Sequence, residues 1–368
     1  MGILRVIFAL SVVASHVWPG GPVFVGAKNA VELFYVISGF LISFILVERK
    51  TYLNIRSFYV NRYLRLYPIY FFVAILVLCT RGHEFFDIYK SASIGAGALL
   101  ILSNTFMFGQ DWVMFAAVKH NTLVFATDFW NSDVILWRGL LIPPAWSIGL
   151  EITFYLMAPF VLPKRRIICC LLIVSVACRA CLIWIGIGTA DPWSYRFFPA
   201  ELAFFLLGAL SHQVLLPFFK RLMQRPDSRL PEVGTAVLIA FALVFDRFAD
   251  SAFKDEVLLA TFVTLLPLAF IFQHRYPLDK WIGNLSYPIY ICHWLVIEAV
   301  RYMIIGKIWA LEFHFAISTM SAFVSILFAV VLNKFIGEPF EKLRGKIKNR
   351  SPVINWASRA PAALSIDP

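Results

Sequence analysis

The sequence predicts an all-α fold, a polytopic bundle of transmembrane helices. Of its 368 residues, 60% are apolar and only 15% are charged, and the mean hydropathy of +0.76 is typical of proteins that fold in a bilayer. Apolar stretches recur along the whole chain, and no hydrophilic stretch is long enough to form a soluble domain. We therefore predict one membrane domain over residues 1–345 and a disordered cytoplasmic tail over residues 346–368.

The apolar stretches are numerous enough for about ten membrane crossings. A further stretch, residues 96–108, is too short to cross a bilayer as a helix and is expected to be re-entrant or half-buried. The candidate spans are residues 3–19, 30–47, 66–79, 145–162, 167–187, 197–216, 232–247, 256–273, 285–305 and 311–333.

Short basic loops set the expected topology. If the N-terminus is cytoplasmic and the chain crosses ten times, the basic segments all fall on the cytoplasmic side: residues 48–65, 164–166, 220–229, 274–280 and the tail from residue 334. We therefore expect a multi-pass protein of the inner (cytoplasmic) membrane with both termini in the cytoplasm. Residues 110–144 then form an external segment, rich in Trp and Phe, that is expected to act as an interfacial lid.

The net charge of +11 does not indicate nucleic-acid binding. The basic residues lie in short loops beside apolar stretches rather than on one polar face, so they are better explained as topology signals. The expected partner is the lipid bilayer, and no nucleic acid. No group of His and Cys with metal-ligand spacing falls in a polar loop, so we expect no metal site.

The first apolar stretch contains an arginine and a histidine, which are costly to bury in hydrocarbon unless they are paired. The spacing of Arg5 and His16 puts both side chains on one face of a helix, about 16 Å apart along its axis. Intramembrane ionisable residues are candidates for a functional site. We predict that these two residues form the two ends of one pocket.

Two more motifs border the second and third spans. Gly39 is expected to allow close packing of helices, while its neighbour Ser38 is a candidate buried donor in the site. Arg62 and Arg65 are three residues apart and share a helix face at the membrane rim, where guanidinium groups suit phosphates. The spacing predicts a phosphate-bearing cytosolic ligand.

The fourth span opens with residues 146–155 and contains a buried acid. Ser147 and Glu151 are four residues apart and share a face. A carboxylate in an apolar helix needs a partner, and Arg5, His16 or another buried cation could supply it. Such a pair could be structural, or it could tune an ionisable His, and the sequence leaves both open.

The ninth span places a second histidine, His293, among aromatic residues. A core histidine bonded to a backbone carbonyl is the commoner outcome, so we assign His293 a supporting role. In the sixth span, Arg196 and Glu201 are expected to form an internal ion pair at the outer rim.

Taken together, these motifs resemble the acyltransferase-3 family of integral membrane acyltransferases, over nearly the whole chain. Each motif alone is weak, but five in the expected order are specific. The family's patterns match as Arg-x10-His at Arg5 and His16, Phe-Phe-x-x-Ser-Gly-Phe-Leu at residues 34–41 with Tyr35 for the second Phe, Arg-x-x-Arg at Arg62 and Arg65, Trp-Ser-Leu-x-x-Glu at residues 146–151 with Ile148 for Leu, and Ser-Tyr-x-x-Tyr-x-x-His at Ser286, Tyr287, Tyr290 and His293.

The resemblance implies an O-acetyltransferase. Its donor would be acyl-CoA, usually acetyl-CoA, as a co-substrate rather than a tightly bound cofactor, and its acceptor a carbohydrate hydroxyl of an exopolysaccharide, an O-antigen, a lipid-linked sugar or another surface glycan. On this basis we assign catalysis to His16 and Glu151, acyl-CoA binding to Arg5, Arg62 and Arg65, and supporting roles to Ser38, Trp146, Ser147, Tyr155, Tyr287 and His293.

The expected topology gives this site a direction. The three arginines lie toward the cytoplasm, whereas His16 and Glu151 lie in the outer half of the membrane. CoA phosphates would rest on the basic rim, and an extended pantetheine arm would reach His16. His16 would act as a general base or as a transient acyl carrier, with Glu151 orienting or charging its imidazole.

A non-enzymatic transporter of a lipid-linked sugar or of a proton-coupled solute is the competing interpretation. Buried Arg, Glu and His residues also mark transport pathways. Against it, the sequence contains no pair of Gly- or Pro-broken spans in matching halves.

Overall fold

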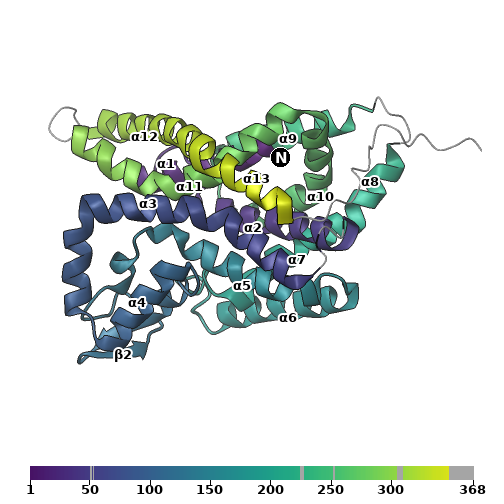
Figure 1. Cartoon of the computed structure of the whole chain (residues 1–368). Coiled ribbons are helices and arrows are strands. Elements are labelled where there is room, and N and C mark those ends of the chain that lie inside the picture. The colour runs from purple at the N-terminus through teal and green to yellow at the C-terminus, as the bar shows by residue number, and fades with distance from the viewer. Residues whose placement is uncertain (50–51, 53, 224–227, 252, 305–309, 348–368) are drawn as a thin grey trace, which may run out of the picture.

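The computed structural model describes residues 1–49, 52, 54–223, 228–251, 253–304 and 310–347. Helices dominate it, as expected for an all-α bundle (Figure 1). One small antiparallel hairpin departs from that expectation and consists of β1 (Ala116–Lys119) and β2 (Thr122–Phe125). The helices are α1 (Gly2–Val17), α2 (Ala27–Ser43), α3 (Ile55–Ser91), α4 (Ile94–Phe106), α5 (Trp146–Val161), α6 (Arg165–Trp184), α7 (Phe198–Leu210), α8 (Leu216–Leu222), α9 (Leu230–Val244), α10 (Lys254–Arg275), α11 (Pro277–Ile304), α12 (Ala310–Leu332) and α13 (Glu338–Ile347).

Each expected span coincides with a helix, but the helices differ in their capacity to cross a bilayer. Within the described residues, α1 and α4 are apolar but short. Six helical segments have both the length and the hydropathy of a span: Ala27–Glu48, Ile55–Ser91, Arg165–Trp184, Phe198–Leu222, Lys254–Arg275 and His314–Ile347. The protein is therefore a membrane bundle, while the count of ten crossings and the re-entrant position of α4 stay predictions. The expected tail lies outside the described residues from residue 348 onward.

Three of the basic segments that were expected to share one side of the membrane, residues 48–65, 220–229 and the tail, contact one another. Lys220 Nζ lies 3.0 Å from Glu48 Oε1, and Asn61 Nδ2 donates to the carbonyl of Arg344 at 3.1 Å. Figure 1 shows α4 and β2 at the lower left, far from α8 at the right. This arrangement agrees with the expected topology.

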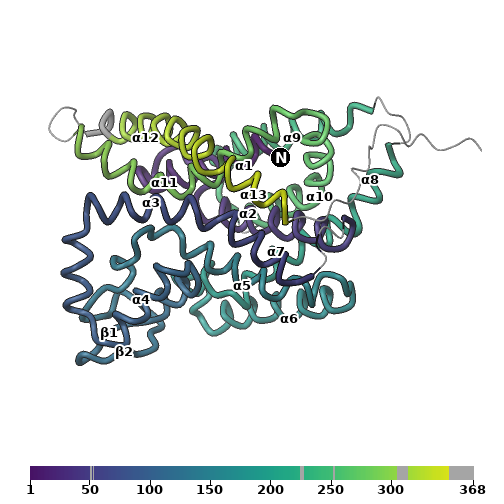
Figure 2. Tube along the Cα trace, viewed as in Figure 1, coloured from purple at the N-terminus to yellow at the C-terminus, as the bar shows by residue number. Residues whose placement is uncertain are grey.

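Helix α3 connects the two ends and is bent. The side chain of Asn54 caps its start by accepting from the backbone N–H of Ser57 at 2.8 Å. Its backbone leaves helical values at Arg81, where φ is −132° and ψ is 16°. Beyond this bend, the chain leads into α4 and the hairpin (Figure 2). The external segment is thus a folded cap of short helical turns and a hairpin.

Two glycines set the contact between α2 and α7. A Cβ atom on Gly39 would lie 1.8 Å from the carbonyl oxygen of Phe205, and one on Gly208 would lie 1.9 Å from that of Val36. The predicted packing role of Gly39 is confirmed. Because Gly39 faces α7, its neighbour Ser38 is turned toward α5.

An acid from α11 caps the start of α1. Asp279 accepts hydrogen bonds from the backbone N–H groups of Gly2, at 2.7 Å, and Ile3, at 2.9 Å. These N–H groups have no partner within α1 itself. The contact therefore fixes α1 against α11, the helix that carries the ninth-span motif.

Candidate functional site

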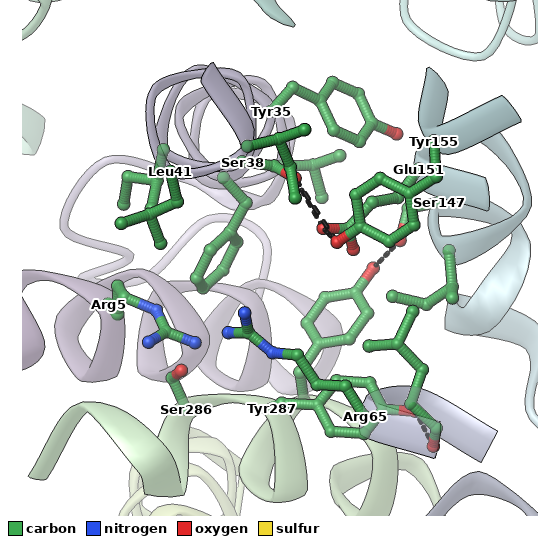
Figure 3. Close-up of a pocket in the computed structure, with 17 residues that line it drawn as sticks. Arg5, Tyr35, Ser38, Leu41, Arg65, Ser147, Glu151, Tyr155, Ser286 and Tyr287 are labelled. Atoms are coloured by element: carbon green, nitrogen blue, oxygen red, sulfur yellow. Dashed lines mark hydrogen bonds between the residues drawn. The ribbon is translucent and has the colours of Figure 1, made fainter. Parts of the chain in front are cut away.

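One cavity inside the bundle collects residues from α1, α2, α3, α5 and α11 (Figure 3). Its volume of about 80 Å³ has room for several water molecules. The predicted site residues that line it are Arg5, Ser38, Arg65, Ser147, Glu151, Tyr155 and Tyr287. Motifs from both ends of the sequence therefore meet in one place.

The Glu151 carboxylate is held by two hydroxyl groups at one edge of this cavity. Ser38 Oγ donates to Glu151 Oε1 at 2.6 Å, and the hydroxyl of Tyr155 donates to the same oxygen. Both bonds are charge-assisted, and together they fix the carboxylate on the cavity wall.

Two arginines face the opposite part of the cavity. The guanidinium groups of Arg5 and Arg65 point toward each other in Figure 3. Neither makes an ion pair or a hydrogen bond with another described residue. Two unpaired like charges at one place form a strong binding site for an anion, because an anion would neutralise both.

Arg62 lies in a different cavity from Arg65, although the two share a helix face. This neighbouring cavity has a volume of about 350 Å³ and shares Leu66 and Tyr155 with the first. Arg62 Nη2 donates to the hydroxyl of Tyr52 at 3.1 Å, while its buried Nε and Nη1 atoms have no partner in the described structure. Both arginines are thus available to anions, in adjoining spaces.

Arg344 on α13 adds a buried cation that we did not predict from the sequence. Its Nε donates to the carbonyl of Asn61 at 3.1 Å and its Nη2 to the Asn61 side chain at 3.2 Å. These bonds anchor α13 to α3 beside Arg62. The only sequence signal is a basic stretch after the last span, which topology alone would explain.

His16 lies beyond the cavity and pairs with His293. His16 Nδ1 is 2.8 Å from the Val12 carbonyl and 3.3 Å from His293 Nε2, while His293 Nδ1 is 2.7 Å from the Tyr290 carbonyl. A carbonyl can only accept, so each Nδ1 carries a proton. In the neutral imidazole, His16 Nε2 is then the unprotonated nitrogen. The carbonyl bond expected for His293 is confirmed.

The predicted contact between Glu151 and His16 is wrong for this structure. Glu151 is bonded to Ser38 and Tyr155, and the ring partner of His16 is His293, with centroids 5.1 Å apart. Hydroxyl donors on α2 and α5 satisfy the carboxylate, so no buried cation is needed to pair with it.

Tyr290 connects the cavity with His293. Its hydroxyl lies 2.7 Å from Ser147 Oγ and donates to the Pro144 carbonyl at 2.9 Å, and its ring lines the cavity. Its own carbonyl accepts from His293. Tyr290 and His293 therefore lie in sequence between the arginine-lined space and His16.

Trp146 lies outside the cavity and covers an arginine. The Arg196 guanidinium is 4.2 Å from the centroid of the Trp146 ring, a cation–π contact. The predicted pair of Arg196 with Glu201 is wrong, because Arg196 pairs with Asp191 at 2.5 Å. Glu201 instead pairs at 2.9 Å with Arg179.

Asp111, in the external segment, packs behind α5. A Cβ atom on Gly149 would lie 2.6 Å from Asp111 Oδ1, and this oxygen has no hydrogen-bond partner among the described residues. Burial raises the pKa of Asp111 to about 7. The folded protein therefore favours the neutral carboxyl.

We expect Asp111→Asn to remove a pH-dependent loss of stability. The carboxyl contributes its full stability below its unfolded pKa and loses it as the pH rises toward 7. The variant and the wild type should melt alike below about pH 4, and the variant should melt at least about 2 °C higher near about pH 8. Thermal melting of purified protein in detergent measures this, and equal melting at both pH values would contradict it.

Comparison with known proteins agrees with this architecture. A family model described as an acyltransferase domain matches residues 1–335. The peptidoglycan O-acetyltransferase of Listeria monocytogenes is 24% identical over 324 residues, which cover 80% of this chain and 48% of that protein. A Staphylococcus aureus protein named as an O-acetyltransferase is 24% identical over 388 residues, which cover 95% of this chain and 58% of that protein.

The chain thus spans about half the length of these curated relatives. No solved structure matches it.

Proposed function

We propose, from the premise that the chain belongs to the acyltransferase-3 family, that this membrane O-acetyltransferase transfers acetyl from acetyl-CoA to a carbohydrate hydroxyl. In this proposal both termini are on the cytoplasmic side of the inner membrane; the donor would enter from that side and the acceptor from the opposite side. The observation that carries this proposal is the unpaired Arg5 and Arg65 in one cavity, one tyrosine away from the two histidines.

The part of the cavity that contains Arg5 and Arg65 suits the phosphates of acetyl-CoA. CoA carries phosphates, and guanidinium groups bind phosphates through paired N–H donors. Residues 2–17 are one continuous helix, so Arg5 and His16 are separated by a rise of about 16 Å. An extended pantetheine arm has a comparable length, which lets the thioester approach His16 while the phosphates remain near the arginines.

His16 serves as the general base in this proposal. The acceptor hydroxyl oxygen attacks the thioester carbonyl carbon and gives its proton to His16 Nε2. The carbon–sulfur bond then breaks, and the CoA thiolate takes the proton from the imidazolium. The products are an O-acetyl ester and free CoA. The Val12 carbonyl, 2.8 Å from Nδ1, holds the ring in the tautomer that leaves Nε2 basic.

Glu151 and Tyr290 position groups around this step. Glu151, fixed by Ser38 and Tyr155, adds a negative charge opposite the two arginines and limits how deep an anion can enter. Tyr290 lies across the path from the cavity to His16. Its side chain must rotate away from Ser147 when the thioester passes.

The proposed reaction is tested by incubating membranes with radiolabelled acetyl-CoA and the glycans of the source cell. Membranes that contain the protein should transfer label to glycan in a form that mild alkali releases, as expected for an ester. Membranes without the protein should not. Equal labelling of the two samples, or label confined to lipid or protein, would contradict the proposal.

A further inference from the structure

A third cavity, which we call the outer cleft, lies beside Trp294, whose ring contacts His16. It has a volume of about 370 Å³ and is lined by Arg81, Glu84, Trp137, Arg138, Pro143 and Trp294, among others. These residues come from the bend of α3, from the external segment and from α11. One water molecule needs roughly 10–15 Å³. The cleft is many times larger, so it has room for a ligand.

Trp294 connects the outer cleft to the proposed base. Its ring lines the cleft and meets the His16 ring edge to face, with centroids 5.4 Å apart. A ligand that lies on Trp294 is therefore one side chain away from the imidazole. The donor cavity approaches the same histidine pair through Tyr290, so both cavities lie close to these two rings.

The aromatic residues of the cleft suit a sugar ring. Trp137 and Trp294 line the cleft, and the C–H face of a pyranose can pack on an indole ring. Trp137 Nε1 has no hydrogen-bond partner among the described residues. Rotation of this ring toward a sugar oxygen would therefore cost no existing hydrogen bond.

The charges of the cleft favour an acidic sugar. Arg81 binds Glu84 through two hydrogen bonds, of 2.9 and 2.5 Å, so these two charges cancel. Arg138 is exposed, and its guanidinium lies 5.8 Å from the centroid of the Trp137 ring. It has no carboxylate partner in the part of the chain that the structure describes. The cleft thus presents one uncompensated cation beside an aromatic surface.

We infer that the outer cleft binds the acceptor and that this acceptor carries a carboxylate, as in a glycan that contains uronic acid residues. The sugar ring packs on Trp137, and its carboxylate accepts paired hydrogen bonds from Arg138. A hydroxyl of the same or the adjoining sugar then reaches His16 past Trp294. This inference rests on the proposed acetyl transfer and adds the chemical class of its acceptor.

The test compares two forms of the glycans extracted from the source cell. One half is left intact, and in the other half the carboxyl groups are chemically reduced to hydroxymethyl groups. Wild-type membranes should label the intact glycans with acetyl about tenfold or more above the reduced glycans, the factor expected for one charge-assisted contact. Arg138→Ala should lower labelling of the intact glycans to the level of the reduced ones.

Matched variants separate recognition from folding. Lys119→Ala removes an exposed positive charge from the hairpin. This variant should still label intact glycans in preference to reduced glycans. Arg138→Ala should label reduced glycans as well as the wild type does, which shows that it is folded. Equal labelling of intact and reduced glycans by the wild type would overturn the acidic acceptor while leaving acetyl transfer in place. Absence of label from both would instead overturn the proposed transfer.

Discussion

Replacement of His16 by alanine is expected to lower acetyl transfer by at least about 100-fold, the lower range for loss of a general base. The imidazole is the only proposed proton acceptor between the two cavities, and its Nε2 is kept unprotonated by the bond from Nδ1 to Val12. The rate of label transfer at saturating acetyl-CoA measures the effect. The KM for acetyl-CoA should change little, because His16 does not line the donor cavity.

His274 provides a matched control for the loss of His16. Its Nδ1 makes the same type of bond, to the carbonyl four residues earlier, Phe270, at 2.9 Å, but it lies at the end of α10. His274→Ala should therefore carry a similar structural cost and retain activity. If the two variants keep equal activity, His16 is not the base.

An acyl-histidine intermediate would give a different result. If His16 carries the acetyl group, wild-type protein incubated with labelled acetyl-CoA and no acceptor should hold label that hydroxylamine releases and that His16→Ala lacks. A general base predicts no such label.

Replacement of Arg5 or Arg65 by alanine should raise the KM for acetyl-CoA by about 10- to 100-fold, as expected for loss of a charge-assisted contact with phosphate. The same variants should be at least as stable as the wild type, because each removes one of two like charges that face each other without a partner. This combination separates a binding role from a structural role, in which loss of an arginine would lower stability.

Arg166 is a suitable control for these arginines. It is exposed on α6 at the end of the bundle where the basic segments lie, so Arg166→Ala removes the same charge from a place that does not line the cavity. The KM of Arg166→Ala for acetyl-CoA should match that of the wild type. A rise in KM of equal size in Arg166→Ala and Arg5→Ala would point to a general effect of surface charge and contradict a dedicated anion site.

Helix positions and the convergence of motifs could be predicted from the sequence. Apolar length marks each helix, and the cost of buried charge singles out Arg5 and Glu151 before any contact is known. The packing role of Gly39 follows from its lack of a side chain and is confirmed at 1.8 Å.

Hydrogen-bond partners could not be predicted in the same way. Glu151 is satisfied by Ser38 and Tyr155 rather than by His16, because the relative rotation of α2 and α5 decides which donors reach it. Arg62 and Arg65 share a helix face yet line separate cavities, and Leu66 and Tyr155 contribute to the walls of both. Sequence spacing specifies a helix face, and tertiary packing specifies the neighbour.

The residues that line the outer cleft could not be predicted either, because several of them lie in a loop. Trp137 and Arg138 belong to a segment without helical periodicity, so their position beside Arg81 and Trp294 could not be predicted from sequence patterns. The bend of α3 at Arg81 brings these segments together. Cavities built by loops and bends depend on non-local contacts, which no short motif encodes.

The central claim is that the donor and the acceptor reach His16 from opposite sides of one membrane. Sealed inside-out vesicles test it most directly, with labelled acetyl-CoA added outside and glycan trapped in the lumen. We expect labelled glycan in the lumen while the vesicles stay impermeable to acetyl-CoA. Labelling that requires both substrates on the same side, or that occurs only after the vesicles are made leaky, would contradict it.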